Sequence, residues 1–315
     1  MKTKTPALAA LATAAALALC GAGAQAQTNV TIYGKLDLGY GKPIGTDLDQ
    51  MLDAAGSRLG FRGTEDLGGG LRALFGLEHR FSPDTGLPNA IFWHGYSTVG
   101  LAGAFGRVNL GRQYTPAFSL IQNQIDPWGG DTIAQLRDVA MRVGGVGKVR
   151  VAKSIRYDWG GSGFNVAASI AQAEQAGSAA GPDRPVSIAA NYEKGPFFVG
   201  AGYEDPANAN DDQWSVGARY ALGPVTLSAG YSWGTTAANA DTKGLLVAAV
   251  WRLGTGELMG GYAKHKVAGK TLNAKASLGY HHWLSKRTKL YADISRDGKA
   301  ASEKSGWDLG LQHNF

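Results

Sequence analysis

The chain has 315 residues, and its 31 Lys and Arg against 25 Asp and Glu give a formal net charge of +6. The single cysteine, Cys20, excludes an intramolecular disulfide framework. The basic residues are spread along the chain rather than clustered, which argues against nucleic acid as a partner.

The first 26 residues are predicted to be an export signal. Two lysines precede a short apolar stretch, and Ala24-Gln25-Ala26 forms a small-residue cleavage site. The apolar stretch is shorter than the ~20 residues that a membrane-spanning helix needs. A lipoprotein signal at Cys20 is disfavoured because Leu19 before it is large. We therefore expect a signal peptide at 1–26 and one domain at 27–315, whose net charge is then +4, since the signal removes two lysines from +6.

Along the rest of the chain, apolar and polar side chains alternate with the two-residue period of β-strands. The segment Leu245–Leu253 is apolar on both faces, so alternation does not fix its register. Sixteen strands are predicted: Val30–Tyr40, Arg58–Thr64, Leu71–Phe81, Trp93–Leu101, Arg107–Gln113, Arg150–Trp159, Phe164–Ala171, Val186–Tyr192, Phe197–Glu204, Trp214–Tyr220, Val225–Trp233, Leu245–Leu253, Glu257–His265, Leu272–Leu284, Leu290–Ser295 and Trp307–Phe315.

The links between these strands are alternately tight and loose. Tight turns such as Lys194-Gly195-Pro196 alternate with longer polar segments such as 172–185, an asymmetry typical of outer-membrane β-barrels. A backbone in hydrocarbon must have every polar group paired, so a spanning sheet has to close on itself. The sequence thus predicts an all-β, transmembrane antiparallel barrel whose first and last strands pair. Sixteen strands leave an aqueous channel.

The positions of the arginines indicate which face of each strand meets lipid. An Arg or Lys facing lipid at the bilayer midplane costs roughly 2–4 kcal/mol, so these side chains are expected to face the lumen. The strand that ends at Gln113 is the exception, because alternation turns Arg112 toward lipid unless a β-bulge turns it inward. The predicted basic wall of the pore contains Lys35, Arg58, Arg62, Arg72, Arg80, Arg156 and, through such a bulge, Arg112.

One long connection, about 114–148, has no clear alternation. Loops of this length without strand pattern are uncommon and usually functional. We expect it to fold into the lumen and narrow it, although an external flap is an alternative. Its acids and its one tryptophan are the candidate constriction residues, and basic side chains facing them would favour anions. These loop residues are Asp126, Trp128, Asp131 and Asp138.

Enzyme, metal and cofactor signatures are not recognisable in the sequence. The Gly147-Lys148 pair is not preceded by the first glycine of a phosphate-binding loop. His281 and His282 point to opposite faces of a strand and cannot chelate one metal ion. We therefore expect neither catalysis nor a cofactor.

Several motifs resemble the general porins of Gram-negative β-proteobacteria, a family that includes the neisserial trimeric porins. Of these motifs, Glu65-Asp66-Leu67-Gly68-Gly69-Gly70 and Leu110-Gly111-Arg112-Gln113-Tyr114 are the most specific in combination. The matching stretches are residues 30–34, 57–71, 99–101, 110–114, 155–158, 284–288 and the terminal Phe315.

The resemblance implies a sixteen-stranded barrel, a homotrimer, and a third loop folded inward as the eyelet, at the place of residues 114–148. It also implies Phe315 as the signal read by the outer-membrane assembly machinery. The expected surroundings are outer-membrane lipid and lipopolysaccharide in a Gram-negative cell.

The sequence therefore favours an outer-membrane general diffusion porin that passes small hydrophilic solutes and ions with a weak preference for anions. One alternative is a solute-specific porin, in which Trp128 and the arginines bind an organic anion or phosphate. Another is a structural or adhesive barrel without a pore.

Overall fold

The computed structural model describes residues 29–142, 146–172, 184–207 and 210–315. The expected signal peptide, 1–26, lies outside them. In the described ranges no helix is long and apolar enough to cross a membrane.

The described chain is a single antiparallel sheet of seventeen strands, sixteen of which close into a ring. Each strand of the ring pairs with its neighbours in the chain, and β1 pairs with both β3 and β17, so the sheet has no free edge. The ring consists of β1 (Asn29–Lys42), β3 (Arg58–Gly68), β4 (Leu71–Arg80), β5 (Tyr96–Gly103), β6 (Gly106–Tyr114), β7 (Arg150–Gly161), β8 (Phe164–Ala171), β9 (Val186–Lys194), β10 (Phe197–Asp205), β11 (Asp212–Leu222), β12 (Val225–Thr235), β13 (Asp241–Leu253), β14 (Gly256–Val267), β15 (Lys270–Trp283), β16 (Thr288–Asp297) and β17 (Ser305–Asn314).

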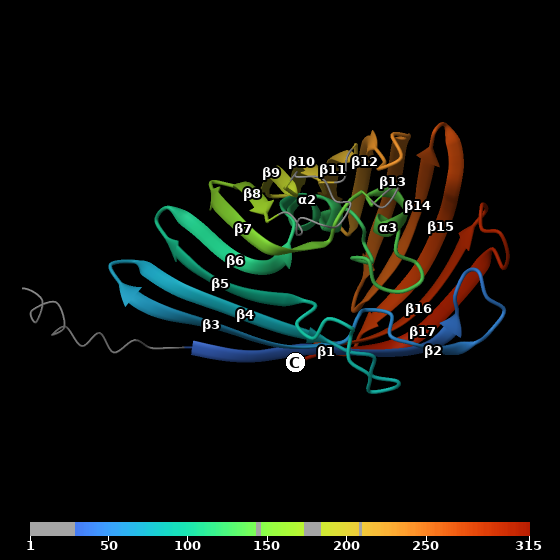
Figure 1. The fold of residues 1–315 in the computed structure, drawn as a ribbon. Coiled ribbons are helices and arrows are strands. Elements are labelled where there is room, and N and C mark those ends of the chain that lie inside the picture. Colours follow the sequence, from blue (N-terminus) through green and yellow to red (C-terminus); the bar gives the residue numbers. More distant parts are fainter. Residues whose placement is uncertain (1–28, 143–145, 173–183, 208–209) are drawn as a thin grey trace, which may run out of the picture.

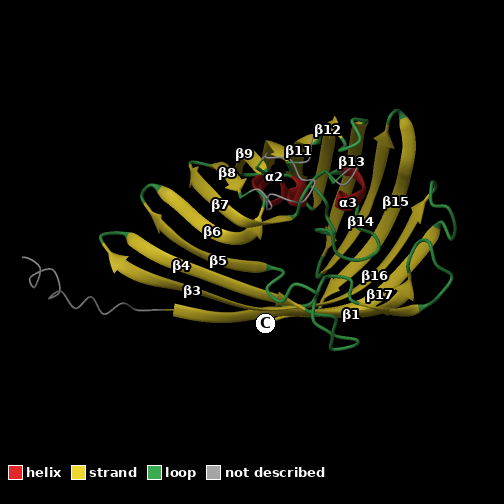
Figure 2. Cartoon of the chain, viewed as in Figure 1, coloured by secondary structure: helices red, strands yellow, loops and turns green. Residues whose placement is uncertain are grey.

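All sixteen predicted strands are present, with bounds shifted by a few residues, and the predicted closed barrel is confirmed. Four short elements were not expected. They are the strand β2 (Gln50–Leu52), which pairs with β1, and α2 (Pro116–Leu120), η1 (Gln122–Gln124) and α3 (Arg137–Ala140) in the long connection. Figures 1 and 2 show these helices beside the inner side of the sheet.

Exposure alternates along the strands and separates the two faces of the barrel. On β13 Leu245 and Val247 are 41% and 43% exposed, whereas Leu246 and Ala248 between them are 0% and 9% exposed. The exposed face of the strands is rich in large apolar side chains, as expected for contact with lipid, and the covered face holds the polar ones.

The described part of segment 114–148 contacts the covered face of the sheet from β8 to β17. Ile125, Leu136 and Met141 of this segment form one apolar cluster with Leu246, Met259 and other inward side chains. This cluster explains why the predicted strand 245–253 is apolar on both faces: one face meets lipid and the other meets the long connection.

Small residues allow this close contact. A side chain at Gly230 on β12 or Gly217 on β11 would overlap Ile125, and one at Gly244 on β13 would overlap the backbone of Ala140. The glycines of the second half of the barrel therefore leave the space in which the long connection packs against the sheet.

Candidate functional site: a basic constriction

The two ends of segment 114–148 are joined at its neck. The Thr115 backbone N–H donates to the Val149 carbonyl at 3.1 Å, and the Thr115 hydroxyl donates to the Lys148 carbonyl at 2.8 Å. The same hydroxyl accepts from the Phe118 N–H and caps α2, with Pro116 at its first turn. Strand β6 therefore leads directly into a closed loop.

Two candidate loop residues anchor the loop rather than line an open space. The Trp128 ring is 3% exposed, and its Nε1 donates to Asp293 Oδ1 on β16 at 2.8 Å. The Asp126 carboxylate accepts from the backbone N–H groups of Trp128, Gly130, Leu136 and Arg137. Trp128 holds the turn Asp126–Asp131 against the wall of the barrel, and Asp126 holds the loop backbone together.

A cavity of about 340 Å³ lies between the other side of this turn and the strands β1, β3, β4 and β7. Five cationic side chains and a single carboxylate line it. They are Lys35, Arg58, Arg80, Arg137 and Arg150, with Asp131 as the carboxylate. Segment 114–148 thus brings Lys35, Arg58 and Arg80 of the predicted basic wall together with one predicted loop acid.

Hydrogen bonds fix these charges. Lys35 Nζ lies 2.9 Å from Asp131 Oδ2, with the two side chains 16% and 21% exposed. Arg58 Nε and Arg80 Nη1 both donate to the Gly56 carbonyl at 3.0 Å, so one acceptor holds two guanidinium groups side by side. Gly56 has φ +61°, which a glycine adopts without strain. Arg80 Nε also donates to Glu78 Oε1 at 2.8 Å.

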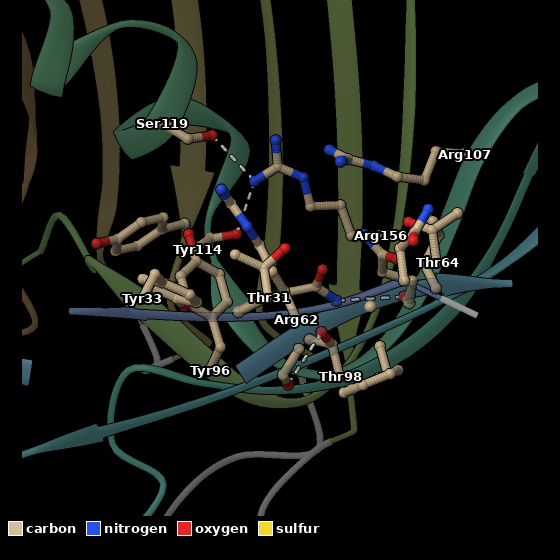
Figure 3. Close-up of a pocket in the computed structure, with 17 residues that line it drawn as sticks. Thr31, Tyr33, Arg62, Thr64, Tyr96, Thr98, Arg107, Tyr114, Ser119 and Arg156 are labelled. Atoms are coloured by element: carbon tan, nitrogen blue, oxygen red, sulfur yellow. Dashed lines mark hydrogen bonds between the residues drawn. The ribbon is translucent and has the colours of Figure 1, made fainter. Parts of the chain in front are cut away.

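A second cavity, of about 570 Å³, continues from the first along the same wall, and Tyr114 lines both. Figure 3 shows the side chains that line it, among them Arg62, Arg107 and Arg156. No carboxylate lines this cavity among the described residues. Arg62 lies over the Tyr33 ring at 5.1 Å, and Arg156 Nη1 donates to Ser119 Oγ at 2.9 Å.

A third cavity, of about 530 Å³, adjoins the second through Arg156 and is lined by Arg72. Arg58 pairs with Arg80 near the loop ends of β3 and β4, and Arg72 pairs with Asp66 next to the tight turn. The three cavities therefore follow one another from the loop end of the barrel to its turn end, each with arginines.

Arg112 lines none of these three cavities. Its Nε donates to the His94 carbonyl at 2.9 Å, in the connection between β4 and β5. A register shift does occur where β6 pairs with β7, between Gly111 and Gln113. It accompanies the positive φ of Lys153 on β7 (+52°) and leaves Arg112 bonded to the neighbouring connection.

Asp138 is bound within the loop. Arg137 Nε lies 3.0 Å and Arg142 Nη1 3.2 Å from Asp138 Oδ1. Burial alone raises the pKa of this carboxyl, but the two guanidinium groups outweigh burial and hold the pKa below its ordinary value. Asp138 therefore stays ionised and cancels part of the loop's positive charge.

Two lining cations were absent from the predicted site. Arg137 lies at the start of α3, which has no strand period, and its guanidinium donates to the Gly129 carbonyl at 2.8 Å. Arg150 begins β7, donates to the Tyr114 hydroxyl at 2.9 Å and lies over that ring at 4.4 Å. The only sequence signal for both was their place in or beside the long connection. In the described ranges, no group of three His, Cys, Asp or Glu side chains could hold a metal ion.

Residues 8–300 match the family model described as Gram-negative porin. The chain is 30% identical over 310 residues to outer membrane porin protein 32 of Delftia acidovorans, covering 90% of this chain and 87% of the relative. A shorter match, 41% identical over 90 residues, covers 28% of this chain and 21% of the major outer membrane protein P.IA of Neisseria meningitidis serogroup C.

Among solved structures, an anion-selective porin from Comamonas acidovorans aligns with a TM-score of 0.78 and 26% identity, covering 92% of this chain and all of that one. The trimer form of OmpT from Vibrio cholerae aligns with a TM-score of 0.71 at 14% identity, covering 91% and 99%, which supports the fold alone.

Proposed function

Because the chain belongs to the Gram-negative porin family, we propose that it forms a water-filled outer-membrane channel whose constriction prefers anions. It is an outer-membrane porin rather than an enzyme, and small hydrophilic solutes cross it passively. The narrow point lies between segment 114–148 and the wall formed by β1, β3 and β4. Orientation follows from the connections: the short turns face the periplasm and the longer loops face outward.

The observation that carries this proposal is the charge of the 340 Å³ cavity. Its five cations face one carboxylate, and that carboxylate already binds Lys35. Two of the other cations, Arg80 and Arg137, are also bound to carboxylates, of Glu78 and Asp138. Five cations against three carboxylates leave a net positive charge at the opening, and basic groups that line a pore favour anions.

A solute-specific porin is the second candidate. Trp128 is buried against the wall and is not free to contact a solute, so the predicted Trp128 part of such a site loses its support. The second cavity keeps the idea open, because three arginines and three tyrosines line it. Arg107 and Arg156 pair with Asp158, whereas no ion pair joins Arg62 to a carboxylate in the described ranges.

Single-channel recording separates the two candidates. Purified protein is reconstituted in planar bilayers, and conductance is measured over a range of chloride, phosphate and organic carboxylate concentrations. A general porin gives conductance that rises in proportion to salt and no saturable block. Saturable block by one anion, abolished by Arg62→Ala, supports the specific porin, and a protein that does not conduct contradicts both.

We further propose that the protein is a homotrimer, that it contacts lipopolysaccharide, and that Phe315 directs assembly. Support for the trimer comes from the trimer form of the OmpT relative in structure and from the broad apolar outer face of the barrel. The connection between β4 and β5 also exposes Leu87, Ile91 and Phe92, which a neighbouring protomer could cover.

A further inference from the structure

The tip of the long connection, residues 126–135, covers three carboxylates that do not line the 340 Å³ cavity. Asp37 on β1, Asp293 on β16 and Asp308 on β17 are 0%, 2% and 1% exposed. Asp293 and Asp308 are direct cross-strand partners, and Asp37 lies near enough for its charge to act on Asp308. The three residues therefore form one acid cluster on the covered face of the sheet, beneath the tip.

Polar contacts to two of these carboxylates hold the tip on the wall. The Ile133 N–H donates to Asp308 Oδ2 at 3.0 Å, and Trp128 Nε1 donates to Asp293 Oδ1 at 2.8 Å. Between them Thr132 has φ +62°, which is unfavourable for a residue with a side chain, and its N–H donates to a carbonyl of the β2–β3 connection at 3.0 Å. The acid cluster thus holds a strained turn in place.

The charges around the acid cluster do not balance. Lys275 on β15 and Lys289 on β16 face it and are 7% and 8% exposed, so two cations meet three carboxylates. Lys275 also faces Asp126 of the turn. Other charged or titratable groups that face the cluster are Lys35 with its partner Asp131, Asp53, His281 and Tyr291. Among the described residues no hydrogen-bond donor reaches Asp37 Oδ2 or Asp308 Oδ1, so negative charge is in excess.

His281 does not supply the missing positive charge. Its Nδ1 lies 3.2 Å from Lys289 Nζ, and its Nε2 lies 3.1 Å from Asp293 Oδ2. Because an ammonium group can only donate, Nδ1 is the acceptor and the ring is neutral.

This excess of charge makes the position of the tip depend on protons. Carboxylates that are buried close together, with oxygens that no donor reaches, favour the protonated form, whereas carboxylates in water are ionised. The acid cluster therefore binds more protons while the tip covers it than when the tip is away. Raising the pH thus favours departure of the tip from the wall.

We propose that the tip has a second position, in which it leaves β16 and β17 and enters the 340 Å³ cavity, and that raising the pH populates this position. The basic opening then narrows, and the acid cluster faces the channel. Anion preference falls as a result, since carboxylates that line a pore favour cations. The inference rests on the proposed anion-preferring constriction, and it makes Asp37, Asp293 and Asp308 positioning residues of that constriction.

The first test measures reversal potentials of the full-length protein in planar bilayers from about pH 6 to about pH 9, where arginines keep their charge. The anion-to-cation permeability ratio of the unchanged protein should fall on the order of fivefold, the effect in water of one further carboxylate charge near the path. Asp308→Asn keeps the shape of the side chain and removes its charge, so its ratio should stay constant. Asp37→Asn, which leaves the Ile133 contact intact, should reduce the fall.

Asp158→Asn is the matched control, because Asp158 is an acid of the third cavity that pairs with two arginines and lies outside the acid cluster. Its permeability ratio should fall with pH by the same factor as in the unchanged protein. His94 and His281 are present in every variant. A pH response that survives in Asp308→Asn therefore comes from other groups and contradicts the proposal.

Amide hydrogen exchange follows the tip itself. The Thr132 and Ile133 N–H groups should lose protection as the pH rises, by up to about tenfold per pH unit if one proton is released, after correction for the intrinsic exchange rate. The Ile121 N–H, which donates to the Ala117 carbonyl at 3.1 Å, is the control and should keep its protection.

The two measurements separate this inference from the proposed function. Unchanged protection at the tip, or an anion preference that does not vary with pH, overturns the inference and leaves the anion-preferring channel in place. A channel without anion preference at about pH 6 contradicts the proposed function. In that case the exchange of the Thr132 and Ile133 N–H groups still decides whether the tip leaves the wall.

Discussion

Lys35 and Asp131 determine how much negative charge an ion meets at the constriction. The pair is partly exposed, so solvent screens it, and the Asp131 carboxylate still lies on the path of an anion. We expect Asp131→Asn to raise the anion-to-cation permeability ratio, by up to roughly fivefold if one charge about 4 Å away contributes about 1 kcal/mol in water. Reversal potentials in a salt gradient measure this ratio.

Asp84→Asn is the control for this change, because Asp84 is an exposed acid in the connection between β4 and β5. It should leave the ratio unchanged. An unchanged ratio in Asp131→Asn, or an equal rise in both variants, would place the selective charge elsewhere in the channel.

Trp128 acts through its contact with the wall. Trp128→Phe removes the Nε1 donor to Asp293, which keeps its second contact, to His281 Nε2 at 3.1 Å. Leaving a buried carboxylate oxygen without its donor costs about 1–3 kcal/mol, which loosens the loop but not the barrel. We expect noisier single-channel currents and faster trypsin cleavage at Arg137 or Arg142. Trp159→Phe, on the lipid face, should change neither, and equal behaviour of the two variants would rule out the anchoring role.

The inward glycines of β11, β12 and β13 determine where segment 114–148 packs against the sheet. A leucine at Gly230 would overlap Ile125 and contact Met141, so Gly230→Leu should displace the segment at a cost of about 1–3 kcal/mol. The barrel should still form, with its heat-dependent gel shift, while conductance changes. Gly260→Leu is the matched control, because only Leu278 lies within 4 Å of a Cβ atom there, at 3.8 Å. Unchanged conductance in Gly230→Leu would contradict this docking.

Elements with a strict period were predictable from the sequence, and the loop contacts were not. Alternation located all sixteen strands because lipid and water impose opposite demands on neighbouring residues. It failed to fix the register of 245–253, since Leu246 and Ala248 face another protein segment and not water. It could not assign Arg150 either, because the register shift at Gly111–Gln113 of β6 lies opposite residues 151–154 of β7 and interrupts the period between Arg150 and Arg156.

Some residues of the constriction could likewise be predicted from the sequence, and others could not. Lys35, Arg58 and Arg80 could be assigned to one wall from their phase on neighbouring strands. The role of Asp126 could not, because its four backbone donors come from a turn that only the folded loop creates. An acid in a loop was therefore expected to be a charge in the pore, whereas this one is a structural acceptor.

In the closed barrel the backbone of Phe315 pairs with β1, and its aromatic ring is proposed to act as an assembly signal. Its backbone N–H donates to the Gly34 carbonyl at 3.1 Å, and its carbonyl accepts from the Gly34 N–H at 3.0 Å. Phe315→Ala keeps both bonds, so we expect refolding in detergent at an unchanged midpoint. In cells the same variant should insert into the outer membrane several-fold less, as measured by fractionation. Normal insertion would mean that the aromatic ring carries no assembly signal.

We propose that the basic wall gives the whole channel its preference for anions. The most direct measurement is the reversal potential of the reconstituted protein in a potassium chloride gradient, compared with Arg58→Ala plus Arg80→Ala. The structure predicts that the reversal potential of the unchanged protein has the sign expected when chloride permeates more easily than potassium. In the double variant the reversal potential should shift toward the value expected for potassium. A cation-preferring wild type, or a double variant with an unchanged potential, would contradict the account.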